Sequence, residues 1–140
     1  VWTTFDEEAV ILSEHLGDIA YTSLDGKMSE EARLASLSRF RNGDLSVMIS
    51  KPQLIGYGLN LQFVTSMVFA GFDDSMERKY QAIRRAYRFG QTETVRVFVP
   101  YIPELEGMVF ENLRQKEARF IAEVTAQELQ YRNALMEAAE

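Results

Sequence analysis

The chain has 140 residues, a formal net charge of −6 and 46% hydrophobic residues. This length and composition predict a single folded domain and exclude an entirely disordered chain. The absence of cysteine excludes disulfides and cysteine-based zinc sites, and the one histidine, His15, is too few for a histidine-rich site, so we expect no metal site here. With no signal peptide and no apolar run near the roughly 20 residues of a membrane span, we expect a soluble, cytoplasmic protein with no membrane partner. Because the chain opens on strand-like residues rather than on Met, we expect it to be part of a longer protein.

The charge is unevenly distributed along the chain. Residues 51–103 carry a net charge of +3, whereas residues 1–50 and 104–140 carry −5 and −4. A basic segment between acidic flanks is often only a solvated surface, but it is also typical of a segment that binds an anionic partner. The acidic total therefore does not exclude nucleic acid.

Apolar runs and helical periodicity alternate along the chain. Short runs rich in strand-favouring residues predict strands at Val1–Phe5, Ile19–Leu24, Leu45–Ile49, Met67–Ala70 and Val95–Tyr101. Apolar spacing at i, i+3 or i+4 and capping residues predict four helices. The first begins at Asp6 and has an apolar face of Ala9, Leu12 and Leu16, and the second follows Ser29 and has an apolar face of Ala32, Leu34, Leu37 and Phe40. The third spans Asp74–Phe89, and the fourth begins at Glu104. This alternation predicts an α/β fold with a mostly parallel sheet, which binds ligands at the carboxyl ends of its strands.

The helix expected over residues 74–89 is the most informative segment. Met76, Tyr80, Ile83 and Tyr87 would form one apolar stripe, and Gln81, Arg85 and Arg88 would lie together on the opposite face. Repeated positive charge on one short helix is unfavourable unless an anionic partner offsets it, and arginine matches phosphate oxygens. A solvated basic face that pairs with the acidic flanks explains the pattern equally well.

The loop after Leu45–Ile49 contains Gly56 and Gly58, which could let backbone amides approach a phosphate. A dinucleotide-binding fingerprint would need a third glycine where Leu61 stands, and the chain contains no G-x-x-x-x-G-K-[ST] loop. A tight structural turn is therefore the simpler interpretation of the two glycines. Likewise, we interpret Asp73 and Asp74 as helix-capping residues rather than as a metal site.

Three segments carry a resemblance to a known family. Residues 81–91, QAIRRAYRFGQ, match Q-A-x-x-R-x-x-R-x-G-Q, the sixth motif of SWI/SNF-type ATPases in helicase superfamily two, at every fixed position. Residues 56–61 resemble the fifth motif of this family, and residues 24–33 resemble the stretch where its second helix begins. The chain thus resembles the second RecA-like lobe of these motors over nearly its whole length.

The resemblance implies roles for individual residues. Arg88 would be the arginine finger that reaches ATP, and Arg85 would lie beside it in the same cleft. Nucleotide binding would involve Gln81 and the loop residues Gly56, Gly58 and Asn60, and nucleic-acid binding would involve Lys51 and Ser50. The chain departs from the family at Pro52 and Gln53, where many relatives carry Ser or Thr and Arg or Lys.

The resemblance also implies an architecture and partners. We expect a three-layer RecA-like core over residues 1–103 and a helical extension over residues 104–140 that packs on it. ATP with Mg²⁺ would be bound mainly by a first lobe absent from this chain, so the isolated chain should not hydrolyse ATP, and the motor should act on DNA, in double-stranded form. The alternatives are a non-catalytic interaction domain with a basic docking helix and, less favoured, a small nucleotide-binding enzyme.

Overall fold

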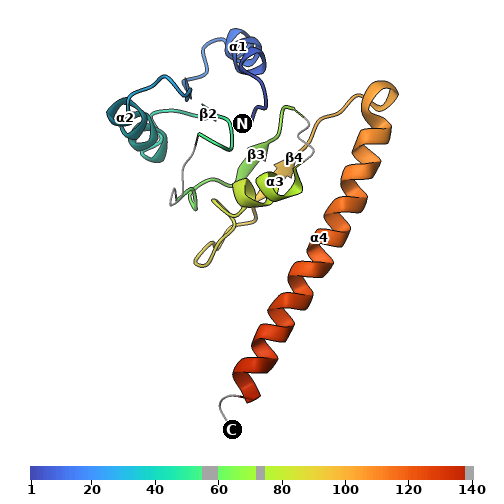
Figure 1. The fold of residues 1–140 in the computed structure, drawn as a ribbon. Helices are drawn as coiled ribbons and strands as arrows, with labels where there is room; N and C mark the ends of the chain where they lie inside the picture. The colour runs from blue at the N-terminus through green and yellow to red at the C-terminus, as the bar shows by residue number, and fades with distance from the viewer. Residues whose placement is uncertain (55–59, 72–74, 138–140) are drawn as a thin grey trace. The chain divides into compact units, whose positions relative to one another are not determined.

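The computed structural model describes residues 1–54, 60–71 and 75–137 (Figure 1). The chain divides into two compact units, Val1–Pro100 and Tyr101–Glu140. The elements of the first unit are α1 (Asp6–His15), β1 (Tyr21–Ser23), α2 (Glu30–Arg41), β2 (Val47–Ile49), β3 (Ser66–Val68), α3 (Met76–Ile83) and β4 (Arg96–Phe98). The second unit contains α4 (Pro103–Glu137).

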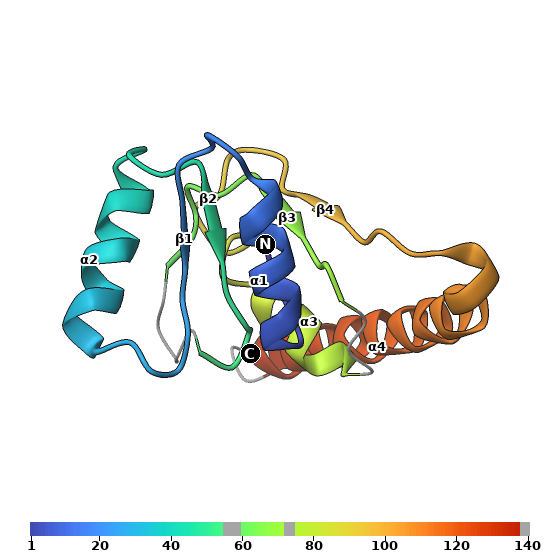
Figure 2. The same cartoon turned by 90° about the horizontal axis from the view of Figure 1, so that it is seen from above.

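Every strand pair in the described ranges is parallel. β1 pairs with β2, with Thr22 opposite Met48, and β3 pairs with β4, with Met67 opposite Val97. The opening residues join the two pairs, because Trp2 forms parallel bridges to both Ser50 and Phe69. The order across the sheet is therefore β1, β2, opening segment, β3, β4, and Figure 2 shows the four named strands in this sequence. The predicted mostly parallel sheet is confirmed.

Backbone hydrogen bonds fasten the opening segment on both sides. The Thr3 amide donates to the Ser50 carbonyl at 3.0 Å, and the Ser50 amide donates to the Val1 carbonyl at 3.0 Å. On the other side, the Ala70 amide donates to the Trp2 carbonyl at 2.9 Å. The segment is thus the central strand of the first unit, although it is too short to be assigned as a regular strand.

One apolar cluster underlies this arrangement. Its buried members come from the strands, the loops that follow them and the α3 region, and they are Trp2, Leu24, Met48, Leu61, Met67, Phe69, Ala82 and Ala86. The rings of Trp2 and Phe69 lie 6.4 Å apart at the centre of the sheet. Because the cluster draws on both strand pairs, burying it holds the two halves of the first unit together.

Local sequence explains where α2 begins and ends. The Ser29 hydroxyl accepts a hydrogen bond from the Ala32 amide at 3.2 Å, which satisfies one of the free amides of the first turn. After the last turn, Gly43 adopts φ +84°, a conformation that favours glycine. Both the cap and the Asn42-Gly43 stop were predicted and are confirmed.

The predicted apolar face of α2 is partly wrong. Arg33, Ser36, Leu37 and Phe40, at i, i+3, i+4 and i+7, are half-buried, whereas two predicted members of the face are exposed, Ala32 and, at 59%, Leu34. Leu34 follows the first of these residues by one position, or about 100° around the helix, so it lies at the edge of the buried face. The position of the core, not the apolar character of the side chain, selected that face.

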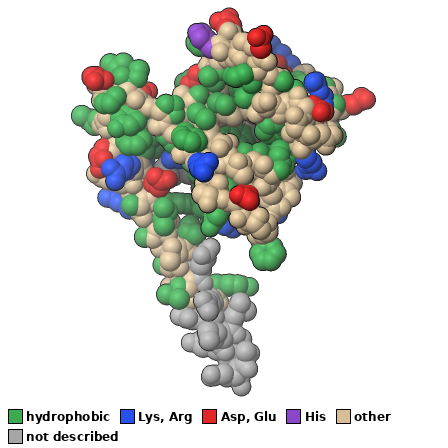
Figure 3. Space-filling model, turned by 180° about the vertical axis from the view of Figure 1, so that it is seen from behind, with side chains coloured by type: hydrophobic (Ala, Val, Ile, Leu, Met, Phe, Trp, Pro, Cys, Tyr) green, Lys and Arg blue, Asp and Glu red, His purple; other side chains and the backbone are tan. Residues whose placement is uncertain are grey.

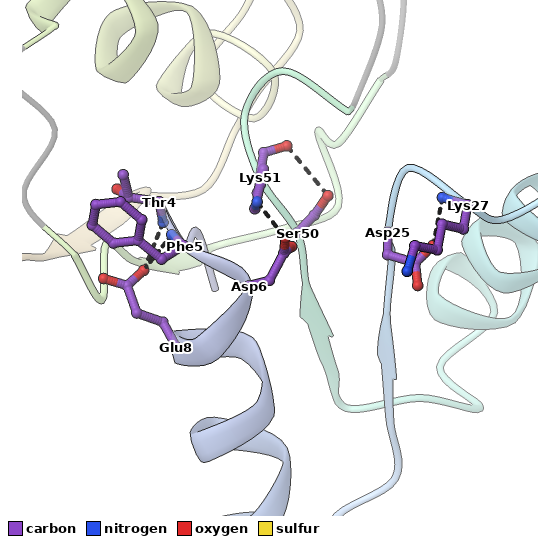
Figure 4. Close-up of polar contacts among 8 residues, drawn as sticks. All are labelled: Thr4, Phe5, Asp6, Glu8, Asp25, Lys27, Ser50 and Lys51. Atoms are coloured by element: carbon purple, nitrogen blue, oxygen red, sulfur yellow. Dashed lines mark hydrogen bonds and ion pairs between the residues drawn. The ribbon is translucent and has the colours of Figure 1, made fainter.

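α1 follows its predicted pattern. Ala9, Leu12 and Leu16 are all half-buried, as their spacing indicated. The Glu8 carboxylate accepts hydrogen bonds from the Thr4 amide at 2.7 Å and the Phe5 amide at 3.1 Å (Figure 4). These bonds fasten the start of α1 to the chain that leaves the central strand.

α4 forms the second unit. It begins one residue before the predicted Glu104, and the Glu106 carboxylate caps it by accepting from the Ile102 amide at 2.7 Å. The rings of Tyr101 and Phe110 stack with centroids 4.0 Å apart across the first two turns. The predicted division at residue 103 and the packing of this extension on the core stay predictions.

None of the helices in residues 1–54, 60–71 and 75–137 combines the length and apolar character that crossing a bilayer requires.

We expect Ile49→Ala to lower the free energy of unfolding of the chain by about 2–5 kcal/mol, because Ile49 is 0% exposed in β2 and its truncation leaves a cavity. Ile11→Ala is the matched control, since Ile11 is 56% exposed on α1 and should change stability by at most about 0.5 kcal/mol. Urea unfolding measures both, and equal effects would contradict the assignment of Ile49 to the core.

Candidate functional site

The predicted basic helix is shorter than expected. α3 ends at Ile83, so of the three residues predicted to share one helical face only Gln81 lies on the helix, where it is exposed. Arg85 and Arg88 lie in the turn that follows, the first half-buried and the second exposed. The predicted apolar stripe is also wrong at Tyr87, which is 59% exposed.

A tertiary hydrogen bond explains why α3 stops. In a continuing helix the Arg85 carbonyl would accept from the Phe89 amide, but it accepts instead from the Leu61 amide at 2.9 Å. After Ile83 some hydrogen bonds span three residues instead of four, as when the Arg85 amide donates to the Ala82 carbonyl at 3.2 Å, although the Tyr87 amide still donates to the Ile83 carbonyl at 2.9 Å. Burial of Ala82 and Ala86, at 4% and 0% exposed, holds this turn against the core.

The turn presents two arginines without partners. Among the residues that the structure describes, neither the Arg85 nor the Arg88 guanidinium has a hydrogen bond or an ion pair. By contrast, the Arg84 guanidinium lies 5.7 Å from the centre of the Tyr80 ring, a cation–π distance. Arg85 and Arg88 are therefore the guanidinium groups of this turn that are free to meet an anion.

A network of amides joins this turn to the end of the glycine-bearing loop. The Gln62 side chain donates to the Phe89 carbonyl, and the Gln91 side chain donates back to the Gln62 carbonyl at 2.6 Å. Asn60 completes the network, because its Oδ1 accepts from the Gln62 amide at 3.0 Å and its Nδ2 donates to the Gln62 side chain at 3.0 Å. The structure thus brings Asn60 close to the arginine turn, and it adds Gln62, which no sequence pattern singled out.

Lys51 lies elsewhere in the first unit, in a cavity of about 770 Å³ beside α1. Its ammonium group forms an ion pair with Asp6 at 2.8 Å (Figure 4). Thr3 and Lys27 also line this cavity, and the Thr3 hydroxyl is buried with no hydrogen-bond partner among the described residues. The cavity opens at the carboxyl ends of β1, β2 and the central strand, where a parallel sheet is expected to bind its ligands.

Ser50 faces inward rather than into a ligand site. It is 2% exposed, and its hydroxyl donates to the Lys51 carbonyl at 3.3 Å. A nucleic-acid contact from the Ser50 side chain stays a prediction, and its burial disfavours it. The amphipathic pattern could not reveal this burial, which follows from the bridge between Ser50 and Trp2.

Other predicted residues fall outside the described ranges or form no site. Gly56, Gly58, Asp73 and Asp74 lie outside the described residues. The N-cap of α3 is Ser75, whose hydroxyl accepts from the Arg78 amide at 3.3 Å, so the helix begins later than the predicted Asp74. Within the described part of the chain, no group of three or more His, Asp or Glu could hold a metal ion.

Surface charge shows no broad binding patch on the face drawn in Figure 3. Acidic and basic side chains are scattered there among apolar ones, and no single-sign patch stands out among the residues described. This face therefore offers no general positive field that would attract an anion.

Comparison with known families bears on the choice between a helicase lobe and a non-catalytic interaction domain. The model of the helicase conserved C-terminal domain matches residues 1–90, which include both strand pairings with Trp2 and the arginine turn. The chain belongs to this family. The predicted C-terminal helicase lobe of SWI/SNF type is thereby confirmed, and the match favours it over a non-catalytic interaction domain.

Relatives of this helicase lobe include much longer proteins. The chain is 35% identical over 89 residues to human TATA-binding protein-associated factor 172, covering 63% of this chain and 5% of that protein. It is 31% identical over 102 residues to the chromatin remodeling factor mit1 of Schizosaccharomyces pombe, covering 71% and 7%. It is 33% identical over 104 residues to the probable ATP-dependent DNA helicase CHR23 of Arabidopsis thaliana, covering 72% and 10%. The helicase lobe thus spans a tenth or less of these relatives.

A solved structure supports the fold of this helicase lobe. The chain superposes on the C-terminal part of the Fun30 ATPase domain with a TM-score of 0.64 and 25% sequence identity, covering 70% of this chain and 33% of that one. The predicted RecA-like α/β fold is confirmed.

We expect Gln91→Ala to lower the stability of the helicase lobe by about 1–3 kcal/mol. The Gln91 side chain donates to the Gln62 and Ala86 carbonyls and accepts from the Glu93 amide. Its removal takes these bonds from the Gln62 carbonyl and the Glu93 amide, whereas the Ala86 carbonyl keeps the Arg88 amide as a donor. Gln53→Ala is the control, because Gln53 is exposed and should change stability by at most about 0.5 kcal/mol. Thermal unfolding compares the two variants, and equal melting temperatures would show that the amide network is not stabilising.

Proposed function

We propose that this helicase lobe is the second motor lobe of an ATP-dependent DNA translocase or helicase and that Arg88 is its arginine finger. The observation that carries the proposal is the turn after α3, which presents the guanidinium groups of Arg85 and Arg88 without partners among the described residues. Unpaired arginines in a braced turn are suited to an anion that another part of the motor delivers.

Guanidinium chemistry suits this role. Its planar set of N–H donors matches phosphate oxygens, and it stays charged at every physiological pH. In phosphoryl transfer, negative charge spreads over the oxygens of the transferring group, and an arginine that reaches them stabilises the transition state. Arg88, which is exposed, would make this contact. Arg85, which is half-buried, would be the second catalytic arginine beside it, and Gln81, which is exposed, would bind the nucleotide.

The amide network supports a coupling role for the neighbouring loop. Asn60 contacts Gln62, and Gln62 and Gln91 hold the arginine turn through backbone carbonyls. A displacement of Asn60 would therefore pull on the turn that bears Arg88. We propose that this connection transmits nucleotide binding toward the nucleic-acid track.

The rest of the active site would belong to the first lobe. The described residues offer guanidinium and amide donors for phosphate but no carboxylate cluster for Mg²⁺, so we propose that the first lobe holds the ion and most of the ATP. Bound Mg²⁺ would neutralise charge on the phosphate oxygens. Closure of the cleft between lobes would bring Arg88 to the γ-phosphate, and repeated closure and opening would move the motor along its track.

We propose DNA, in double-stranded form, as the track and Lys51 as a contact to its phosphate backbone. Relatives described as a DNA helicase and a chromatin remodeling factor support DNA over other anions. Lys51 supports the contact because its ammonium group lines a cavity at the carboxyl ends of the strands.

In a protein that joins this lobe to its first lobe, Arg88→Ala should lower kcat for DNA-stimulated ATP hydrolysis about a thousandfold or more, with DNA binding retained. Arg39→Ala removes the same charge from the exposed surface of α2 and should leave kcat within about twofold. Near-normal turnover by the Arg88 variant would refute its assignment as the arginine finger.

The 140-residue chain alone should not hydrolyse ATP measurably, with or without duplex DNA, because half of the active site is missing. Phosphate release measured with excess Mg²⁺-ATP tests this expectation, and the two-lobed protein serves as the positive control. Robust hydrolysis by the chain alone would show that the catalytic groups are misassigned.

A further inference from the structure

The ion pair between Asp6 and Lys51 connects two distant parts of the helicase lobe. Asp6 is the first residue of α1, and Lys51 follows β2 by two residues. Their side chains meet at 2.8 Å, with Lys51 24% exposed and Asp6 81% exposed (Figure 4). The carboxylate is thus the more solvent-accessible member of the pair, and it occupies one side of the ammonium group that a phosphate would need to contact.

The pair contributes little to folding. A carboxylate that is 81% exposed keeps most of its hydration, and such surface pairs add little stability. The first turn of α1 needs no contribution from Asp6 either, because it also contains Glu7 and Glu8, and Glu8 already caps the amides before it. A stabilising role therefore does not account for the placement of Asp6 against Lys51.

The surrounding cavity contains a second lysine and further acids. Lys27 lines the same space as Lys51. The other acids that line the cavity are Glu14 and Asp25. The Asp25 carboxylate already accepts from the Lys27 and Met28 amides, and Glu14 has no described ion-pair partner, so Asp6 is the acid that competes directly for the Lys51 ammonium group.

We propose that Asp6 is a positioning residue for Lys51 that lowers the affinity of the lobe for nucleic acid. This inference rests on the proposed contact between Lys51 and the DNA backbone. Without DNA, Asp6 holds the ammonium group in the cavity. A DNA phosphate must displace this carboxylate and then remain close to its negative charge, so each binding event carries an electrostatic cost that also eases release.

A charge-matched pair of variants tests the proposal. In the two-lobed protein, Asp6→Asn should tighten binding to a fluorescent 20-base-pair duplex about three- to fivefold at low salt. It should lower the DNA concentration for half-maximal ATPase by the same factor and leave the maximal rate unchanged, a split that a merely structural effect would not produce. Glu7→Gln removes the same charge one residue away, where no described ion pair exists, and should change the affinity less than twofold.

The Lys51→Ala background separates the inference from the function on which it rests. If Asp6 acts through Lys51, Asp6→Asn adds no more than Glu7→Gln when Lys51 is absent. Equal effects of the two acid variants in the wild-type background would overturn the inference while leaving DNA binding by Lys51 intact. Unchanged DNA affinity on Lys51→Ala alone would refute the Lys51 contact and the inference with it, and thermal unfolding of each variant excludes loss of fold as the cause.

Discussion

The insertion of the opening residues between β2 and β3 is the constraint on which the rest of the helicase lobe depends. Trp2 bridges to Ser50 on one side and to Phe69 on the other, so a segment of three residues turns two separate strand pairs into one parallel arrangement. Burial of Trp2 against Phe69 adds apolar contact to these hydrogen bonds. The same insertion directs the chain into α1 beside the end of β2, which is what brings Asp6 within reach of Lys51.

A second long-range contact shapes the arginine turn. The Leu61 amide donates to the Arg85 carbonyl, which would have accepted from the next helical turn. Close to this bond, the Gln62 side chain donates to the Phe89 carbonyl and the Gln91 side chain donates to the Gln62 carbonyl. A backbone turn held from outside has fewer conformations than a frayed helix end. The arginines it carries are thus placed by contacts with Leu61 and Gln62, which precede β3.

Charge distribution fits a lobe that supplies only part of an active site. The chain has a net charge of −6, yet the proposed anion contacts lie in the segment with a charge of +3 and depend on a few residues. Lys51 is itself paired with an acid, whereas Arg85 and Arg88 have no partner among the described residues. Within one lobe, a lysine paired with an acid would suit a nucleic-acid track that must be bound and released repeatedly. Unpaired arginines would suit a nucleotide that reaches them only on cleft closure.

The sequence by itself determined the order and type of the elements, the parallel sheet, the Ser29 cap and the family, because caps, apolar periodicity and motif spacing are local properties of the chain. It placed the C-terminus of α3 six residues too late, counted Leu34 and Tyr87 among the apolar faces and did not reveal that Ser50 is buried. Only the tertiary structure decided these points, together with the Asp6–Lys51 pair and the Gln62–Gln91 network. Each depends on a contact between segments distant in sequence, and the free energy of such a contact is not contained in the periodicity of either segment.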